Sequence, residues 1–155
     1  MADGGGAMSL GTQVALSEPE FRQLQALFYE RVGIQLPPVK KPLICGRLSK
    51  RLTALGLSSY QRYYQYLTSA QGAAELEIAI DLITTHETYF FREPKHFDFL
   101  RERLQDDLRN GSQPLRIWSA ACSSGEEPYT LALLLAEQLK ARQWEILASD
   151  ISTRI

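Results

Sequence analysis

The segment 116–139 constrains the fold of this chain more than any other part of the sequence. An apolar run at its start leads into a loop of small residues, 119–127, which holds Gly125 and two adjacent carboxylates, and Pro128 then opens an amphipathic helix. Strand–loop–helix units of nucleotide-binding α/β folds have this pattern, because small residues let a ligand lie against the loop backbone. The segment therefore predicts a parallel α/β unit, although small residues and one glycine are also common in loops that bind nothing.

Three carboxylates indicate what kind of ligand such a loop could take. Glu126 and Glu127 could serve only as helix caps, since the helix dipole favours acids there, but they also make a poor phosphate site because like charges repel. The loop has neither the G-x-G-x-x-G nor the G-x-x-x-x-G-K-[ST] pattern. A second predicted strand, 145–149, ends on Asp150, where an acid can accept hydrogen bonds from two ribose hydroxyls. A ligand with ribose hydroxyls and positive charge, such as S-adenosylmethionine, fits these residues best.

The first half of the chain has the apolar periodicity of short helices. Ser17 and Glu20 form a predicted capping box at the start of one helix, and Gly33 ends it. Apolar stripes at helical spacing predict three further helices before residue 84, which together give a small bundle with short loops. The predicted organisation is a disordered tail over 1–16, a helical domain over 17–83, a linker over 84–93 and an α/β part over 94–155.

Positive charge gathers in one stretch of the predicted bundle. Between Arg31 and Ala74 there are seven lysines and arginines and no acidic residue, although the whole chain has a formal net charge of −1. Such a run can be only a solvated helix face, or it can bind an anionic partner. Nucleic acid and an acidic protein surface both fit the charge, and the shortness of the run weakens the case for nucleic acid.

Several classes of protein and site are not indicated. Cys45 and Cys122 are far apart and form no C-x-x-C pair, and His86 and His96 have no metal-ligand spacing, so we expect neither a metal site nor a disulfide framework. The N-terminal residues lack the basic and apolar regions of a signal peptide. No apolar run approaches the roughly 18 residues that span a membrane. We expect a soluble cytoplasmic protein.

Three motifs resemble one family in both order and spacing. They are F-F-R-E at 90–93, W-S-A-A-C-S-S-G-E-E-P-Y-T at 118–130 and A-S-D-I-S-T at 148–153. These motifs closely resemble the CheR family of chemotaxis receptor methyltransferases, which methylate glutamate side chains with S-adenosylmethionine. The resemblance runs from about Ser17 to the end of the chain. It implies a helical N-terminal domain, used for receptor recognition, followed by the start of a Rossmann-like methyltransferase domain.

The resemblance also implies roles for particular residues. Arg92 corresponds to the active-site arginine of the F-F-R-E motif. The positions that contact the cofactor in relatives correspond here to His86, Thr88, Arg92, Glu127 and Asp150, with His86 standing where asparagine is usual. The face that relatives present to the receptor corresponds to the basic helix with Lys40, Arg47, Lys50 and Arg51. The expected partner is therefore the cytoplasmic region of a chemotaxis receptor, with no nucleic acid and no membrane insertion.

Family members continue well beyond the position of Ile155, so the resemblance implies an incomplete methyltransferase domain. We expect the chain alone to bind cofactor weakly and to be inactive, and two strands with open edges make a dimer plausible. The alternative hypothesis is a non-catalytic binding module whose basic helical domain docks an acidic signalling partner.

Overall fold

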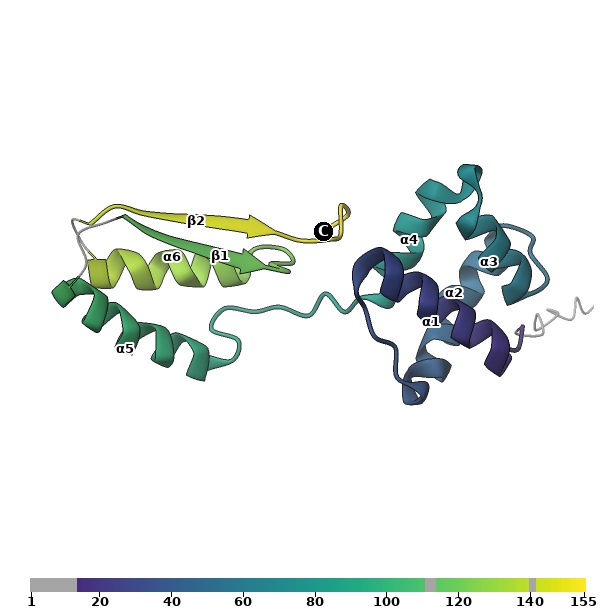
Figure 1. Cartoon of the computed structure of the whole chain (residues 1–155), viewed down its shortest axis with the longest axis horizontal. Helices are drawn as coiled ribbons and strands as arrows, with labels where there is room; N and C mark the ends of the chain where they lie inside the picture. The colour runs from purple at the N-terminus through teal and green to yellow at the C-terminus, as the bar shows by residue number, and fades with distance from the viewer. Residues whose placement is uncertain (1–13, 111–113, 140–141) are drawn as a thin grey trace, which may run out of the picture. The chain divides into compact units, whose positions relative to one another are not determined.

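The computed structural model describes residues 14–110, 114–139 and 142–155. The chain divides into two compact units, Met1–Ile83 and Thr84–Ile155, and each has its own hydrophobic core (Figure 1). Of the predicted tail over 1–16, residues 1–13 lie outside the described residues. Leu16, which the prediction placed in that tail, is buried in the core of the first unit.

The first unit is a helical bundle, as predicted. Its elements over 14–83 are α1 (Glu18–Val32), η1 (Pro38–Lys40), α2 (Lys41–Ala54), α3 (Tyr60–Thr68), η2 (Ala70–Gly72) and α4 (Ala73–Ile83). Their apolar faces meet in one core, because each helix repeats apolar residues at three- and four-residue spacing. The largest fully buried side chains of this core are Phe21, Leu24, Phe28, Ile44, Leu48, Leu52, Tyr60, Tyr63 and Leu67.

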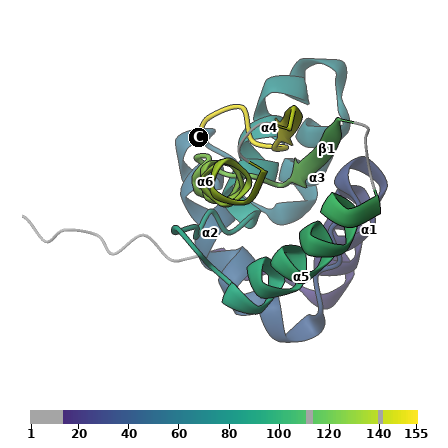
Figure 2. The same ribbon diagram turned by 90° about the vertical axis from the view of Figure 1, so that its left-hand side faces the viewer.

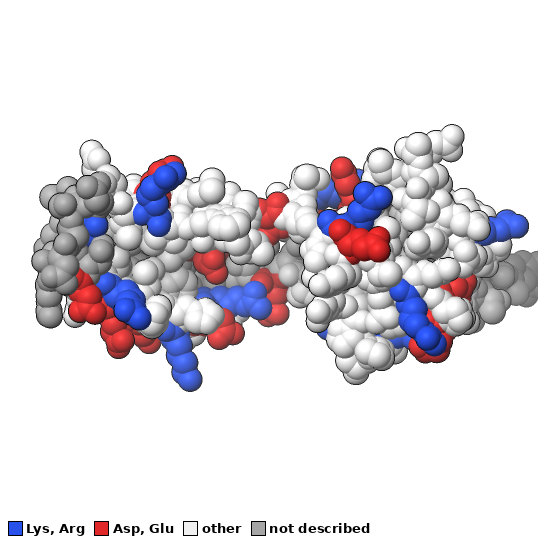
Figure 3. All heavy atoms as spheres, viewed as in Figure 1, with Lys and Arg blue, Asp and Glu red and all other residues white. Residues whose placement is uncertain are grey.

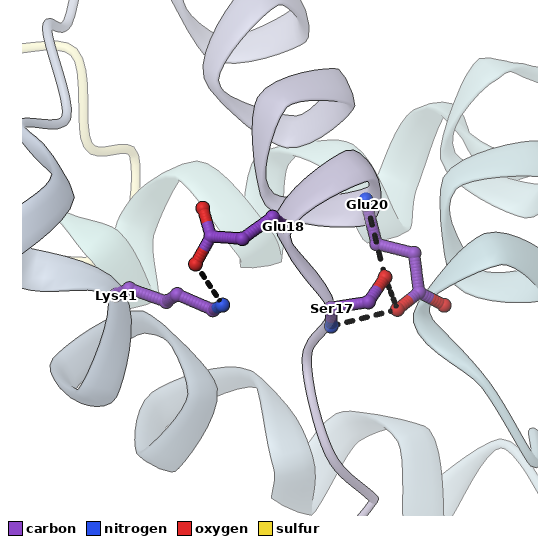
Figure 4. Close-up of polar contacts among 4 residues, drawn as sticks. All are labelled: Ser17, Glu18, Glu20 and Lys41. Carbon is purple, nitrogen blue, oxygen red and sulfur yellow. Dashed lines mark hydrogen bonds and ion pairs between the residues drawn. The ribbon is translucent and has the colours of Figure 1, made fainter.

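The predicted capping box at the start of α1 is confirmed (Figure 4). The Ser17 N–H donates to Glu20 Oε2 at 2.9 Å, and the Ser17 hydroxyl oxygen accepts the Glu20 N–H at 3.4 Å. The other oxygen of Glu20 accepts the backbone N–H of Gln61 in the first turn of α3, at 2.9 Å. One side chain therefore satisfies backbone donors at the starts of two helices, which fixes α1 against α3. Lys41 also pairs with Glu18, which joins α2 to α1.

A buried carboxylate lies at the centre of the first unit. Glu75 of α4 is 5% exposed, and Arg51 of α2 donates to both of its oxygens, at 2.9 and 2.6 Å. The Tyr63 hydroxyl donates to the same carboxylate at 2.9 Å. Burial, and then the neighbouring carboxylate, raises the pKa of Tyr63, so the phenol stays a donor at all physiological pH values. A buried charge needs such partners, because an unpaired carboxylate in a core is strongly destabilising.

The second unit has the predicted α/β order: α5 (Pro94–Asn110), β1 (Leu115–Ala120), α6 (Glu126–Leu139) and β2 (Trp144–Ser149). The two strands are parallel, with Leu115 opposite Trp144 and Ala120 opposite Ser149. Both helices lie on one side of the sheet (Figures 1 and 2). Their core is formed mainly by Phe97, Leu104, Leu131, Leu134, Leu135 and Leu139.

Residues 84–93 contain neither helix nor strand, but they belong to the second compact unit. The buried Thr130 of α6 accepts the Phe91 N–H on its hydroxyl oxygen at 3.2 Å, and the Phe91 ring packs edge-to-face on Phe97 with ring centroids 5.8 Å apart. The segment predicted as a linker is thus fastened to the α/β part. In the part of the chain that the structure describes, no helix has the length and apolar character needed to cross a membrane.

Candidate cofactor site

The loop between β1 and α6 is folded tightly onto the end of β2. The Cys122 N–H donates to Ser149 O at 3.0 Å, and the Gly125 N–H donates to Cys122 O at 3.0 Å. Ala121 and Ser123 have φ angles of 63° and 50°, in the left-handed region that non-glycine residues seldom adopt. Residues held in this conformation cluster at functional sites, where the surrounding structure maintains the strain.

Asp150 follows β2, and its carboxylate holds this loop in place through a hydrogen bond. Its Oδ2 accepts the Ser123 N–H at 2.7 Å, and its Oδ1 accepts the Ser152 N–H at 2.8 Å. Partial burial by itself raises the pKa of this carboxyl, but the N–H groups of Ser152 and Ser123 and the nearby His86 outweigh it and hold the pKa below its ordinary value. Each carboxylate oxygen has a second lone pair. Asp150 therefore remains ionised and keeps acceptor capacity for a ligand's hydroxyl groups.

The segment 84–93 folds back on itself beside the loop. Arg92 Nη1 donates to the carbonyl oxygen of Glu87 at 2.6 Å, and the Arg92 N–H donates to Tyr89 O at 3.2 Å. The Ser123 hydroxyl donates to His86 O at 3.2 Å, which joins this segment to the loop. Two contacts at separate points, from Ser123 and from Thr130, thus hold the segment against the rest of the second unit.

One cavity of about 190 Å³ opens between the segment and the loop. It brings together three residues that the sequence predicts for cofactor binding, Thr88, Arg92 and Glu127. Glu127 accepts the Ser119 hydroxyl on Oε1 at 2.6 Å, which orients its carboxylate. The remaining lining residues are Thr85, Glu87, Tyr89, Phe97 and Ala121.

The other two predicted residues, His86 and Asp150, do not line this cavity. They lie together near Ser123, where the His86 ring is 3.0 Å from the Thr84 hydroxyl and contributes to the lowered pKa of Asp150. A larger hollow of about 530 Å³ lies in the first unit, against α1 and the segment 34–38, and has no acidic or basic lining residue.

The structure adds residues that the sequence did not single out. Ser119 and Ser123 orient Glu127 and Asp150, and both lie inside the recognised 118–130 motif, so their position in the motif was the available signal. Glu87 lines the cavity between the predicted positions 86 and 88, but nothing in its local sequence distinguishes it from an exposed glutamate.

The predicted receptor-binding face separates into two kinds of residue. Lys40 and Lys50 are exposed. Arg51 instead pairs with the buried Glu75, and Arg47 Nη1 donates to Leu82 O at 3.1 Å near the end of α4, so both guanidinium groups take part in packing the unit. The face of the molecule drawn in Figure 3 carries basic and acidic side chains side by side on both units.

Comparison with known proteins identifies the family. Residues 86–155 match the family model described as CheR methyltransferase, SAM binding domain, and residues 19–84 match CheR methyltransferase, all-alpha domain. The chemotaxis protein methyltransferase of Salmonella typhimurium is 41% identical over 150 residues, covering 96% of this chain and 51% of the relative.

The protein of the same name from Borreliella burgdorferi is 39% identical over 151 residues, covering 92% of this chain and 53% of the relative. Chemotaxis protein methyltransferase 2 of Pseudomonas aeruginosa is 40% identical over 138 residues, covering 88% and 48%. The chain spans about half the length of these curated relatives. The sequence resemblance is confirmed: the chain belongs to the CheR methyltransferase family, with the all-alpha domain at 19–84 and the S-adenosylmethionine-binding domain at 86–155.

Proposed function

We propose that the protein transfers the methyl group of S-adenosylmethionine to glutamate side chains in the cytoplasmic region of chemotaxis receptors, forming methyl esters in sensory adaptation. One observation carries the proposal: Thr88, Arg92 and Glu127 line one cavity of a domain whose family binds S-adenosylmethionine. The relatives support the biological context, since they are named chemotaxis protein methyltransferases.

The chemistry of the side chains suits this cofactor. Glu127 offers a carboxylate to a cationic group, Asp150 offers acceptors to ribose hydroxyls, and the planar guanidinium of Arg92 matches a carboxylate. The cavity of about 190 Å³ is smaller than the roughly 300–1,000 Å³ of sites that enclose a drug-sized ligand. It therefore has room for one end of the cofactor, which supports weak cofactor binding and little turnover for this chain alone.

The proposed reaction depends on alignment more than on acid–base catalysis. A glutamate side chain has an unperturbed pKa of about 4.3 and is already ionised near neutral pH. S-adenosylmethionine, when bound, supplies an electrophilic methyl group on a positively charged sulfur. Transfer of that methyl group to the carboxylate oxygen would leave the electron pair of the broken C–S bond on sulfur, and no residue of this chain would have to remove a proton. Arg92 contributes by orienting a carboxylate at the cavity, and such positioning is a large part of a displacement reaction's rate.

The proposed receptor contact lies on α2. Lys50 on α2 and Lys40, which directly precedes α2 in η1, are exposed and available to an acidic protein surface, while Arg47 and Arg51 hold α2 in the bundle. Charge reversal at Lys50, as in Lys50→Glu, is expected to weaken receptor binding and to make it less sensitive to salt, because rim charges act mainly on association.

A second copy of the chain is a further proposed partner. The outer edges of β1 and β2 have no neighbouring strand among the described residues, and Trp118 and Leu147 on the sheet are 67% and 61% exposed. Unpaired edges with apolar side chains favour association. Light scattering over a range of protein concentrations tests this, and a monomer mass at every concentration would contradict it.

The experiment that tests the proposed function is calorimetric titration of this chain with S-adenosylhomocysteine, the reaction product, which cannot be consumed. We expect binding that is lost in Asp150→Ala, because the ribose acceptor and the tether of the loop are removed together. Absence of binding by a folded chain would contradict the proposal and would support the alternative of a non-catalytic binding module, which the comparisons do not favour.

A further inference from the structure

The cavity that Thr88, Arg92 and Glu127 line has a further acidic lining residue, Glu87, to which neither the motifs nor the family resemblance assigns a role. Among the lining residues, Glu87 and Glu127 are acidic and Arg92 is basic. At neutral pH the lining therefore carries one more negative than positive charge. Glu87 supplies the excess, because Glu127 and Arg92 alone would balance.

The backbone around Glu87 is held in place on both sides. The carbonyl oxygen of His86 accepts the Ser123 hydroxyl at 3.2 Å, and the carbonyl oxygen of Glu87 accepts Arg92 Nη1 at 2.6 Å. These two hydrogen bonds fix consecutive peptide units. Glu87 is therefore kept at the cavity by the fold, although it lies outside any helix or strand.

Arg92 balances one negative charge of the lining, but it hydrogen-bonds to a neutral group and to neither acid. Its guanidinium donates to a neutral backbone carbonyl, and Glu127 accepts from the neutral Ser119 hydroxyl at 2.6 Å. The described ion pairs of Lys41 with Glu18, Arg51 with Glu75, Arg101 with Asp98 and Arg116 with Glu145 involve none of the three charged lining residues. The negative charge of the cavity is thus available to a ligand.

We propose that Glu87 is a specificity-determining residue that makes the cavity favour a positively charged sulfur over a neutral one, and so favours S-adenosylmethionine over S-adenosylhomocysteine. This inference rests on the proposed function. The two ligands share the adenosine and the amino-acid end, and they differ in the methyl group and in the charge of the sulfur. When the methyl group passes to the carboxylate oxygen, the sulfur keeps the electron pair of the broken bond and becomes neutral. The attraction to Glu87 is then lost, which favours product release over donor release.

The test is calorimetric titration of this chain with each ligand separately, without receptor, so that no methyl group is transferred. Four proteins are compared: the unsubstituted chain, Glu87→Gln, Glu87→Asp and Glu102→Gln. Glu102 is an exposed acid on α5 that does not line the cavity, so its variant controls for net charge. Glu87→Asp keeps the negative charge and shortens the side chain. It therefore separates the effect of charge from the effect of replacing the residue.

We expect Glu87→Gln to weaken S-adenosylmethionine binding about twofold to fivefold, the range for a solvent-exposed charge interaction, and to leave S-adenosylhomocysteine binding unchanged. Glu87→Asp should retain the preference, and Glu102→Gln should not alter it. Raising the salt concentration should reduce the preference in the unsubstituted chain and not in Glu87→Gln, because salt screens exposed charges.

The outcomes separate this inference from the proposed function. If both ligands bind and Glu87→Gln leaves their affinity ratio unchanged, or weakens both equally, the role of Glu87 is refuted while the cofactor site stands. If the unsubstituted, folded chain binds neither ligand, both proposals fail. Thermal unfolding of Glu87→Gln followed by tryptophan fluorescence shows whether the second unit is intact, since Trp118 and Trp144 both lie in it.

Discussion

Replacing Arg51 by alanine is the most direct test of the difference between a solvated basic face and a structural cation. The substitution removes both guanidinium contacts of Glu75, which is 5% exposed and also accepts the Tyr63 hydroxyl. Removing one partner of a buried ion pair costs about 3–5 kcal/mol of unfolding free energy. The Arg51 side chain is 28% exposed, so water can replace part of its contact. We therefore expect a loss near or below the lower end of that range, about 2–3 kcal/mol.

The two units can be followed separately in one experiment. Both tryptophans lie in the second unit, so tryptophan fluorescence reports that unit, while circular dichroism at helical wavelengths also includes the first. In urea or on heating, Arg51→Ala should shift the circular dichroism transition and leave the fluorescence transition in place. Lys50→Ala, an exposed neighbour on α2, is the matched control and should change neither by more than about 0.5 kcal/mol.

The pH dependence of the loss gives a second check. A buried carboxylate that has lost its cationic partner is tolerated better when it is protonated. The difference between Arg51→Ala and the unsubstituted chain should therefore be smaller at low pH than at neutral pH. A loss below about 0.5 kcal/mol, or an equal loss in Lys50→Ala, would refute the assignment of Arg51 as a structural cation.

Three further predictions concern caps and site residues. Ser17→Ala should cost the first unit about 1 kcal/mol in urea unfolding, because the capping box is lost; an unchanged circular dichroism midpoint would contradict this. The pKa of Asp150 is lower in the folded chain than in the unfolded chain. Ionised Asp150 therefore stabilises the second unit above the unfolded pKa of about 3.9, and this stabilisation is lost as pH falls through the lower folded value. In acid unfolding followed by fluorescence, Asp150→Asn should show less of this loss. Arg92→Ala should weaken S-adenosylhomocysteine binding about tenfold with unchanged unfolding, and Arg92→Lys should not restore it, because lysine lacks the bidentate fork.

Local signals in the sequence predicted those parts of the fold that depend on neighbours in the chain. The Ser17 capping box and the left-handed Gly33 cap appear as expected, since both involve contacts within four residues. The strand–loop–helix–strand order of the second unit was also readable, because strand and helix periodicities differ. Leu43 belongs to the apolar repeat of α2 and is nevertheless 43% exposed, because the core contacts of that helix run through Ile44, Leu48 and Leu52.

The sequence by itself determined the helix order and the α/β pattern, because both depend on spacing along the chain, and its motifs singled out Thr88, Arg92, Glu127 and Asp150 through the family resemblance. Only the tertiary structure decided which charges pair and which face a cavity. Arg51 and Glu75 are 24 residues apart, and no local pattern joins them. In the sequence, Glu87 cannot be distinguished from any exposed acid. Its place at the cavity depends on the hydrogen bonds from Arg92 and Ser123 that hold its segment beside the loop. Charge pairing depends on which distant surfaces pack together, and that information is carried by the whole fold.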